Sequence, residues 1–566
     1  MDVAHYLLQR LREIGLTHLF AVPGDYASAF LTALDDPGSG IVRVSTINEL
    51  GAGYAADGYA RFRGVGAACL QYGVGSFSAL NCIAGSFVER VPVALISASP
   101  ANGDRLRERQ RQILFHHSTG ALDADRAIFA KVTVASEIVC DPDTAPAQID
   151  AALVAMLTHR RPVYIEVTQD CWTAPCAAPQ GQLQPVIATS DADTLAKIVE
   201  AAWNRITTAH DPVLWFGVEI QRFGLQDRAQ RLIDASGLPF TTTSLGKTTL
   251  DEAQPRFIGT FAGPASPALT REVMAKCDCP IALGAIITDD YLAIMAARYA
   301  DMIAVDVERA RVGIDYFPRI ALADLLEALT TRFQADPRYP LPLAGPCAPD
   351  RDPAPASDLA LTYEGVYRIL ADYLAMGERR REIVLVLGES TSLYVLGNMM
   401  GLPRDAFVAQ AAWGSLGHET GAALGIALGS GRRPWVVAGD GGFMMICQEL
   451  SSLVRAGVDA TVFVMSNRGY AIEQAFVDIT AFEPGGNFAA FDELPRWDYP
   501  SLAQAFGAQG LRAETVGVLQ ALLPTLSAPG SGTTLVELVI PPHDLPPQLR
   551  RLAQSPSSIA KYKAPD

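Results

Sequence analysis

Short apolar runs alternate with helical patterns along the first third of the chain. The runs HLFAVP (18–23), IVRVSTI (41–47), AACLQYG (67–73) and VPVALISA (91–98) have the length and composition of buried strands. Segments with helical spacing of apolar residues lie between them, among them NELGAGYAADGYARF (48–62) and FSALNCIAGSFVERV (77–91). Strands that alternate with helices in this way predict a parallel sheet with helices on both faces.

The same alternation returns in the last third and, less regularly, in the middle. Strand-like runs in these parts are PVLWFG (212–217), PIALGAI (280–286), DMIAVDV (301–307), IVLVL (383–387), PWVVAG (434–439), ATVFVMS (460–466) and TLVELVI (534–540). Helical patterns such as HETGAALGIAL (418–428) separate the later runs. The chain is therefore predicted to be an α/β protein of three consecutive domains, each a mainly parallel sheet flanked by helices.

Two segments are typical of linkers. AAPQGQLQPV (177–186) follows a strand-like run, and the proline-rich segment 336–358 cannot sustain a helix or a central strand. We therefore expect a first domain over 1–180, a middle domain over 187–335, a linker over 336–358 and a third domain over 359–566. Each predicted domain is within the usual size range.

Composition and charge exclude several classes of protein. Of 566 residues 49% are hydrophobic, which is incompatible with general disorder. The net charge of 45 − 61 = −16 disfavours nucleic-acid binding, and a bound polyphosphate would need a metal ion or oriented backbone amides. The nine cysteines have irregular spacings, which predicts reduced thiols in a cytoplasmic protein. Cys277 and Cys279 form the closest pair, and no second pair has the spacing of zinc ligands, so we expect no zinc site. We expect no membrane association, because no uninterrupted apolar run is long enough to span a bilayer.

Polar motifs follow two strand-like runs of the last third. Gly439-Asp440-Gly441-Gly442 ends one run, and Asn467-Arg468-Gly469-Tyr470 ends the next. A carboxylate, an amide oxygen and a backbone carbonyl at neighbouring strand ends are the oxygen ligands that Mg²⁺ prefers. Glycines there let backbone amides approach a diphosphate. By itself, Gly-Asp-Gly would equally fit a strand-end turn with a capping aspartate.

Further candidates for chemistry lie in the first third. Glu49 follows a predicted strand and opens a Gly/Ala-rich helix, where a carboxylate also has a purely structural reading as a first-turn acid. Gly24-Asp25-Tyr26 follows another strand, and His116-His117 is an adjacent pair that is most often a solvated loop. Glu473 follows the Asn467 motif.

In combination, these motifs resemble those of the thiamine diphosphate-dependent 2-oxo acid decarboxylases, such as pyruvate, indolepyruvate and phenylpyruvate decarboxylases. The resemblance runs over nearly the whole chain, through AVPGDY, NELGAGYAADGYAR, the His pair, LGKTTLDE, WGSLG, GDGG, NRGYAIE and WDYPSL. It implies a pyrimidine domain and a diphosphate domain around a Rossmann-like middle domain. The implied activity is conversion of a 2-oxo acid to an aldehyde and CO₂ through an enamine intermediate.

The resemblance also implies roles for individual residues. Asp440, Asn467 and the Gly469 carbonyl would bind Mg²⁺, and Glu49 would bond the pyrimidine ring of thiamine diphosphate and activate it. Asp25, His116, His117 and Glu473 would transfer protons. The implied cofactor contacts are Gly24, Val74, Ser390, Leu416 as the wedge below the cofactor, Gly439, Gly441, Gly442, Tyr470 and Ile472. Tyr394, Ile472 and Phe476, with Asp290 or Tyr291, would line the substrate pocket; ordinary core packing is an equal reading of these residues.

Departures from the family pattern and alternatives complete the expectations. Gly442 replaces a common Ser and Ser466 a common Asn, and neither change removes an implied metal ligand. The segment between Glu473 and Trp497 looks longer than in pyruvate decarboxylases. The middle domain lacks GxGxxG, so we expect no second cofactor. The resemblance implies a homodimer as the minimal active unit and a tetramer as the larger assembly. Alternatives are a carboligase of the acyloin or acetolactate synthase kind, and an inactive cofactor-binding scaffold.

Overall fold

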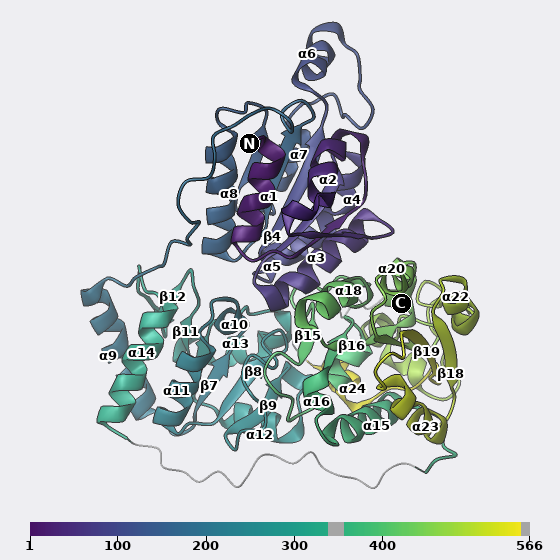
Figure 1. The fold of residues 1–566 in the computed structure, drawn as a ribbon. Helices are drawn as coiled ribbons and strands as arrows, with labels where there is room; N and C mark the ends of the chain where they lie inside the picture. The colour runs from purple at the N-terminus through teal and green to yellow at the C-terminus, as the bar shows by residue number, and fades with distance from the viewer. Residues whose placement is uncertain (338–355, 556–566) are drawn as a thin grey trace, which may run out of the picture.

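The N-terminal third forms the first of three α/β units (Figure 1). The computed structural model describes residues 1–337 and 356–555, so most of the predicted linker 336–358 lies outside the described residues. The strands of this unit are β1 (His18–Ala21), β2 (Val42–Ser45), β3 (Gly66–Gln71), β4 (Val93–Ser99), β5 (Ser136–Val139) and β6 (Val163–Thr168). All pair in parallel, in the order β2-β1-β3-β4-β6-β5.

Helices cover this sheet. They are α1 (Val3–Glu13), α2 (Ser28–Asp35), α3 (Glu49–Arg63), α4 (Val74–Ser78), α5 (Leu80–Val88), α6 (Asn102–Arg111), α7 (Ala124–Phe129) and α8 (Ala145–His159). Helix α3 has clear local determinants, because the side chain of Asn48 accepts a hydrogen bond from the Gly51 N–H at 2.7 Å at its start. Gly64 ends it in the left-handed conformation, with φ of 76°.

The middle unit has a mixed sheet. Its strands are β7 (Pro212–Phe216), β8 (Phe240–Thr243), β9 (Phe257–Phe261), β10 (Cys279–Leu283), β11 (Ile303–Val305), β12 (Ala310–Val312) and β13 (Asp315–Tyr316). The order is β13-β12-β11-β10-β7-β8-β9. The pairs β11-β12 and β12-β13 are antiparallel, and the other pairs are parallel. Its helices are α9 (Ala192–Thr208), α10 (Glu219–Arg222), α11 (Gln226–Ser236), α12 (Ala268–Lys276), α13 (Leu292–Arg298) and α14 (Leu322–Ala335).

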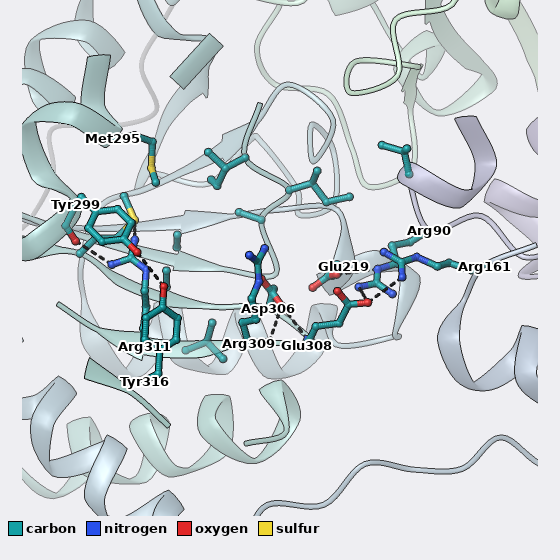
Figure 2. A pocket seen from close by; sticks show the side chains of 18 of the residues that line it. Arg90, Arg161, Glu219, Met295, Tyr299, Asp306, Glu308, Arg309, Arg311 and Tyr316 are labelled. Carbon is teal, nitrogen blue, oxygen red and sulfur yellow. Dashed lines mark hydrogen bonds and ion pairs between the residues drawn. The ribbon is translucent and has the colours of Figure 1, made fainter. Parts of the chain in front are cut away.

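A cavity of about 550 Å³ lies between the first and middle units, near the carboxyl ends of β10 and β11 (Figure 2). Its charged lining is largely paired internally. Arg90 contacts Glu219 at 3.0 Å and Glu308 at 2.8 Å, and Arg161 also contacts Glu308 at 2.8 Å. None of the residues predicted for the active site lines this cavity.

The C-terminal unit again has a fully parallel sheet. Its strands are β14 (Ile383–Leu387), β15 (Phe407–Ala409), β16 (Arg433–Gly439), β17 (Ala460–Ser466), β18 (Gln509–Ala513) and β19 (Thr533–Val539), in the order β15-β14-β16-β17-β19-β18. Its helices are α15 (Tyr363–Ala375), α16 (Arg379–Glu382), α17 (Thr391–Leu396), α18 (His418–Ser430), α19 (Asp440–Ile446), α20 (Glu449–Arg455), α21 (Ala471–Val477), α22 (Tyr499–Ala505), α23 (Val516–Leu526) and α24 (Pro547–Gln554).

Helix α3 of the first unit packs on helix α18 of the C-terminal unit (Figure 1). Small residues bring the two backbones together. A Cβ atom at Gly425 would lie 1.8 Å from the Ala55 carbonyl oxygen, and one at Gly58 would lie 2.4 Å from the Ala422 carbonyl oxygen. One hydrophobic core therefore spans the first and third units, while the middle unit has cores of its own.

The predicted fold class, three α/β units with mainly parallel sheets, is confirmed. Within 1–337 and 356–555, no helix is both long enough and apolar enough to cross a membrane.

Candidate active site

Asp440 is the buried acid of the C-terminal half of the site. It begins α19 directly after β16 and is 3% exposed. Its Oδ2 accepts a hydrogen bond from the Arg468 N–H at 2.6 Å, and its Oδ1 accepts one from the Gly441 N–H at 3.0 Å. Burial raises the pKa of Asp440 to about 6, although these backbone amides lower it in part. Among the described residues, no Lys, Arg or His side chain pairs with this carboxylate.

Asn467 and Gly469 lie beside Asp440 because β16 and β17 are adjacent parallel strands. Asn467 is 2% exposed and follows the last residue of β17. The residues that follow Asn467 are fixed by a short antiparallel contact with the segment 492–494. The Arg468 carbonyl accepts a hydrogen bond from the Leu494 N–H at 3.0 Å, and the Tyr470 N–H donates one to the Asp492 carbonyl at 2.8 Å. A Cβ atom at Gly441 would lie 2.3 Å from the Tyr470 ring, so the glycine is required there.

This half-site fits a hard divalent cation. A buried carboxylate without a counter-charge is costly, and a bound cation would compensate it. The described part of the chain contains no group of three or more His, Cys, Asp or Glu side chains arranged to hold a metal. A set of one carboxylate, one amide and one carbonyl leaves coordination positions for phosphate and water, which is how Mg²⁺ is usually held.

The residues predicted for the pyrimidine side follow three neighbouring strands of the first unit. Gly24 and Asp25 follow β1, Glu49 follows β2, and Val74 follows β3. The Gln71 side chain donates to Asp25 Oδ1 at 2.8 Å and fills the space that a side chain at position 24 would need. Glu49 lies beside Gly75, where a Cβ atom would be 3.6 Å from its Oε1.

The histidine pair is anchored to this same half-site. The Tyr72 hydroxyl donates to the His116 carbonyl at 2.6 Å. The rings of Tyr72 and His117 meet edge to face with centroids 6.1 Å apart, and the tilted ring of Tyr26 lies 5.8 Å from that of Tyr72. Gly73 lies so close to the His117 backbone that a Cβ atom would be 2.2 Å from its carbonyl oxygen. Both histidine residues are exposed.

Glu473 belongs to the C-terminal half, where sequence reasoning missed a neighbouring acid. Glu473 is exposed on α21, while Asp492 is 3% exposed and its Oδ2 has no hydrogen-bond partner within 1–337 and 356–555. Burial, and then the negative charge of Glu473, raise the pKa of Asp492. Asp492 lies in a loop without a motif, so the sequence contained no signal for it.

Within a single chain, the two halves are not joined by polar contacts among the described residues. In the described ranges, no hydrogen bond or ion pair joins Asp25, Glu49 or the histidine pair to Asp440, Asn467 or Glu473. Helix α6, which leads into the histidine pair, lies at the end of the first unit farthest from the C-terminal unit (Figure 1). The start of α3 instead contacts α20 of its own chain, where Asn48 N–H donates to Glu449 Oε1 at 3.3 Å.

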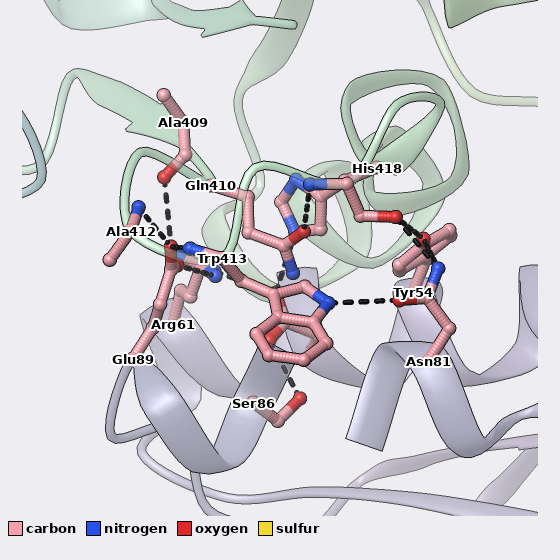
Figure 3. Close-up of polar contacts among 12 residues, drawn as sticks. Tyr54, Arg61, Asn81, Ser86, Glu89, Ala409, Gln410, Ala412, Trp413 and His418 are labelled. Carbon is pink, nitrogen blue, oxygen red and sulfur yellow. Dashed lines mark hydrogen bonds and ion pairs between the residues drawn. The ribbon is translucent and has the colours of Figure 1, made fainter. Parts of the chain in front are cut away.

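The loop that carries Leu416 is held by the first unit (Figure 3). Glu89 accepts hydrogen bonds from the N–H groups of Ala412 and Trp413 at 2.8 and 3.2 Å, and its other oxygen pairs with Arg61 at 2.7 Å. Ser415 contacts the hydroxyl of Tyr54 at 2.6 Å. Leu416 itself is half-buried between these anchored neighbours.

Another ion-pair cluster lies beneath this loop. Asp57 contacts Arg61 at 2.6 Å and His418 Nε2 at 2.8 Å, and all three are buried. Burial would raise the pKa of Asp57, but Arg61 and His418 outweigh it and lower the pKa well below its usual value.

Tyr394 joins two acids at the border of the middle and C-terminal units. Its hydroxyl lies 3.3 Å from both Asp290 Oδ1 and Glu389 Oε1. Burial is the main reason why the pKa of Glu389 is raised to about 8, and the negative charge of Asp290 adds to the effect. Burial likewise raises the pKa of Asp290 to about 6, with a smaller contribution from the negative charge of Asp289. Glu389 Oε2 is fully buried and has no hydrogen-bond partner in the part of the chain that the structure describes.

The other residues predicted for the substrate pocket divide in two groups. Ile472 and Phe476 are only partly buried on α21 and pack against the C-terminal core. Tyr291 is 2% exposed in the core of the middle unit, and its hydroxyl accepts from Ser244 N–H at 3.0 Å. Ser390 caps α17 and lies against Gly439, where a Cβ atom would be 3.5 Å from the Ser390 Cβ.

Comparison with known proteins adds an independent finding. Residues 1–122 match the family model of the thiamine pyrophosphate enzyme N-terminal TPP binding domain, 199–331 the central domain, and 388–538 the C-terminal TPP binding domain. An alpha-keto-acid decarboxylase of Mycobacterium leprae is 32% identical, covering 98% of this chain and 95% of that protein. Pyruvate decarboxylase isozyme 1 of Saccharomyces cerevisiae is 27% identical and covers 97% of each chain. An X-ray structure from Mycobacterium smegmatis has the same fold, with a TM-score of 0.76 at 21% identity over 96% of this chain and 100% of that one.

We predict that Glu89→Ala destabilises the protein by about 3 kcal/mol, because it breaks the buried ion pair with Arg61 and leaves two part-buried N–H groups without this acceptor. Chemical denaturation measures the change. The control is Glu308→Ala: this acid is 50% exposed, and we expect a loss below about 1 kcal/mol. Equal losses in both variants would show that Glu89 does not anchor the loop.

We also predict that the stability of the apoprotein falls as pH rises from about 5 to about 8, in part because folded Glu389 keeps a proton that the unfolded chain releases. Glu389→Gln removes this proton, so the decline becomes shallower and the variant gains stability relative to wild type at the alkaline end. Urea denaturation at several pH values measures it. Glu378→Gln, whose side chain is 73% exposed, should keep the wild-type slope; a wild-type slope in Glu389→Gln would contradict the prediction.

Proposed function

Because this chain belongs to the thiamine diphosphate-dependent 2-oxo acid decarboxylases, we propose that it converts a 2-oxo acid to an aldehyde and CO₂ at a site built from the residues above. The observation that carries the assignment of the site is Asp440, a buried carboxylate beside Asn467 that has no counter-charge among the described residues. It supports a bound cation where the family requires a cofactor.

The C-terminal half would hold the cofactor by its diphosphate. Asp440, Asn467 and the Gly469 carbonyl would ligate Mg²⁺. Contacts to the diphosphate and the neighbouring parts of the cofactor would come from Gly439, Gly441, Gly442, Ser390, Tyr470 and Ile472. The adjacent parallel strands β16 and β17 support this arrangement because they bring both motifs to one sheet edge.

The first unit would hold the pyrimidine ring. Glu49 would share a proton with a ring nitrogen, and Gly24 and Val74 would line the ring's surroundings. Leu416, on its anchored loop, would support the bent cofactor from below. When bound, thiamine diphosphate supplies the carbon nucleophile and the electron sink that decarboxylation requires.

Proton handling would belong to two groups of residues. Asp25, bonded by Gln71, and the pair His116-His117, held through Tyr72, are all on the first unit, and the charge of Glu473 acts on Asp492 in the C-terminal unit. Coupled acids and bases of this kind exchange protons in both directions. Because release of the aldehyde needs one proton delivered to carbon and one removed from a hydroxyl, we assign the two groups jointly to these transfers.

Tyr394, Ile472 and Phe476 would border the substrate. The acids beside Tyr394 make this border polar at one end, and the partly buried Ile472 and Phe476 make it apolar at the other. We therefore place the 2-oxo acid's side chain toward α21.

We further propose that the active unit is a homodimer that pairs the first unit of one chain with the C-terminal unit of another, with a tetramer as the larger assembly. Both half-sites carry exposed apolar side chains that a partner would cover. Ile47 and Val74 are 47% and 57% exposed on the first unit, and Met445, Val477 and Phe491 are 54%, 43% and 72% exposed on the C-terminal unit.

The alternatives make different predictions about products. A carboligase would release CO₂ without an equal amount of aldehyde, and an inactive scaffold would release neither. The proton-handling groups favour the decarboxylase, because a ligase has less need to protonate its intermediate.

Assay of a panel of aliphatic, branched and aromatic 2-oxo acids tests the activity. We expect CO₂ and aldehyde in equal amounts from at least one member, only with thiamine diphosphate and Mg²⁺ present. Asp440→Asn should abolish turnover, because a neutral amide binds Mg²⁺ far more weakly than a carboxylate does. The surface variant Asp227→Asn, whose side chain is 84% exposed, should retain it. Unchanged turnover in Asp440→Asn would overturn the assignment.

Complementation between two inactive variants tests the shared site. Glu49→Gln should lose most turnover but keep cofactor binding, and Asp440→Asn should lose turnover through the metal. When the two chains are co-expressed with different tags, a purified mixed dimer has one site with both halves intact and should regain activity. A mixed dimer as inactive as its parents would place both halves of each site in one chain.

A further inference from the structure

Glu419 is a second buried acid of the C-terminal unit, and the predicted site does not include it. It lies in the first turn of α18, three residues after Leu416, and is 1% exposed. Among the described residues, neither of its carboxylate oxygens has a hydrogen-bond partner. Burial raises its pKa to about 7, although the nearby N–H groups of Glu419 itself and of Gly417 lower it in part.

Two glycines make room for this carboxyl group. A Cβ atom at Gly388, after β14, would lie 2.8 Å from the Glu419 Cδ atom. A Cβ atom at Gly442, in the first turn of α19, would lie 3.0 Å from Glu419 Oε1. The carboxyl group therefore occupies the space between the ends of β14 and β16, where a side chain at position 442 would otherwise lie.

A structural role does not account for these observations. A glutamate in the first turn of a helix usually stabilises it by accepting hydrogen bonds from N–H groups or by facing solvent near the positive end of the helix. Glu419 is 1% exposed, and among the described residues neither oxygen forms a hydrogen bond of normal length and angle, although the N–H groups of Glu419 and Gly417 are near. A buried carboxyl group that forms no hydrogen bond destabilises a fold, so its presence indicates that a bound group supplies the missing partner.

The position of Glu419 identifies that group. Gly442 belongs to the same turn as Asp440 and Gly441, which are proposed to hold the metal and the diphosphate. An ionised carboxylate would repel a diphosphate, whereas a protonated one donates a hydrogen bond to a phosphate oxygen. The charge on the ligand thus selects the protonated form of the acid.

We propose that Glu419 is a cofactor-binding residue, which donates a hydrogen bond from its protonated carboxyl group to the diphosphate of thiamine diphosphate in the place of the side chain that Gly442 lacks. This inference rests on the proposed function, and it adds a polar contact from α18 to a site otherwise formed at the ends of β16 and β17.

Cofactor affinity of the full-length protein tests the inference without reference to turnover. Titration of thiamine diphosphate in excess Mg²⁺, followed by isothermal calorimetry, gives Kd for each variant. Glu419→Ala should weaken binding by about 10-fold to 100-fold, the usual effect of losing a hydrogen bond to a charged group. Glu419→Gln should stay within about three-fold of wild type, because its neutral amide still donates.

A buried acid elsewhere serves as the matched control. Glu219 is 1% exposed in the middle unit, so Glu219→Ala should reduce stability but leave the Kd of the cofactor unchanged. Thermal denaturation of each apoprotein identifies variants that fail to fold. The inference is overturned if Glu419→Ala binds the cofactor as tightly as wild type or more tightly, or if Glu419→Gln loses as much affinity as Glu419→Ala.

A paired substitution tests whether Glu419 and a side chain at position 442 compete for one space. Gly442→Ser alone should crowd Glu419 and weaken binding, whereas Gly442→Ser combined with Glu419→Ala provides both room and a hydroxyl donor. The double variant should therefore bind the cofactor more tightly than the summed losses of affinity in the two single variants predict. Additive losses of affinity would contradict the shared space.

Wild-type protein that binds no thiamine diphosphate would refute the proposed function itself, whereas normal wild-type binding with an unaffected Glu419→Ala would refute only this inference.

Discussion

The contact between helices α3 and α18 is the constraint on which the rest of the structure depends. Glycines at 58 and 425 bring the two backbones within van der Waals distance, so the first and C-terminal units share one core. Helix α18 begins just after the Leu416 loop, and α3 begins at Glu49. The same packing therefore fixes the base of both half-sites, and the ion pairs around Asp57 and Glu89 lock the loop between them.

Acids with buried carboxyl groups and no ion-pair partner in the described ranges recur at the strand ends of the C-terminal unit. Asp440 follows β16, Glu389 follows β14, and Glu419 lies between those two ends. Each has a raised pKa because burial disfavours its charge. Such groups lower the stability of the apoprotein, and a cation, a diphosphate or a substrate bound at this edge would offset that cost. The site is thus a region where binding and stability are linked.

Several features of the site followed from local sequence rules. Strand-like runs followed by Gly24-Asp25, Glu49, Gly439-Asp440 and Asn467 predicted polar residues at the carboxyl edges of parallel sheets, and the structure places them there. Asp492 and Glu419 could not be found in this way. Asp492 joins the site through an antiparallel contact with the Gly469 segment, and Glu419 through its approach to Gly388 and Gly442. Contacts between segments distant in sequence have no local signal.

The sequence by itself determined the three α/β units, the family, and the residue types that can bind a metal and a diphosphate, because hydrophobic periodicity and short motifs are local properties of the chain. Only the tertiary structure decided which acids are buried and, among the described residues, lack hydrogen-bond partners, and that Tyr394 joins Asp290 to Glu389. Desolvation and long-range packing set these features, and both depend on how the units are placed around α3 and α18 rather than on any single segment.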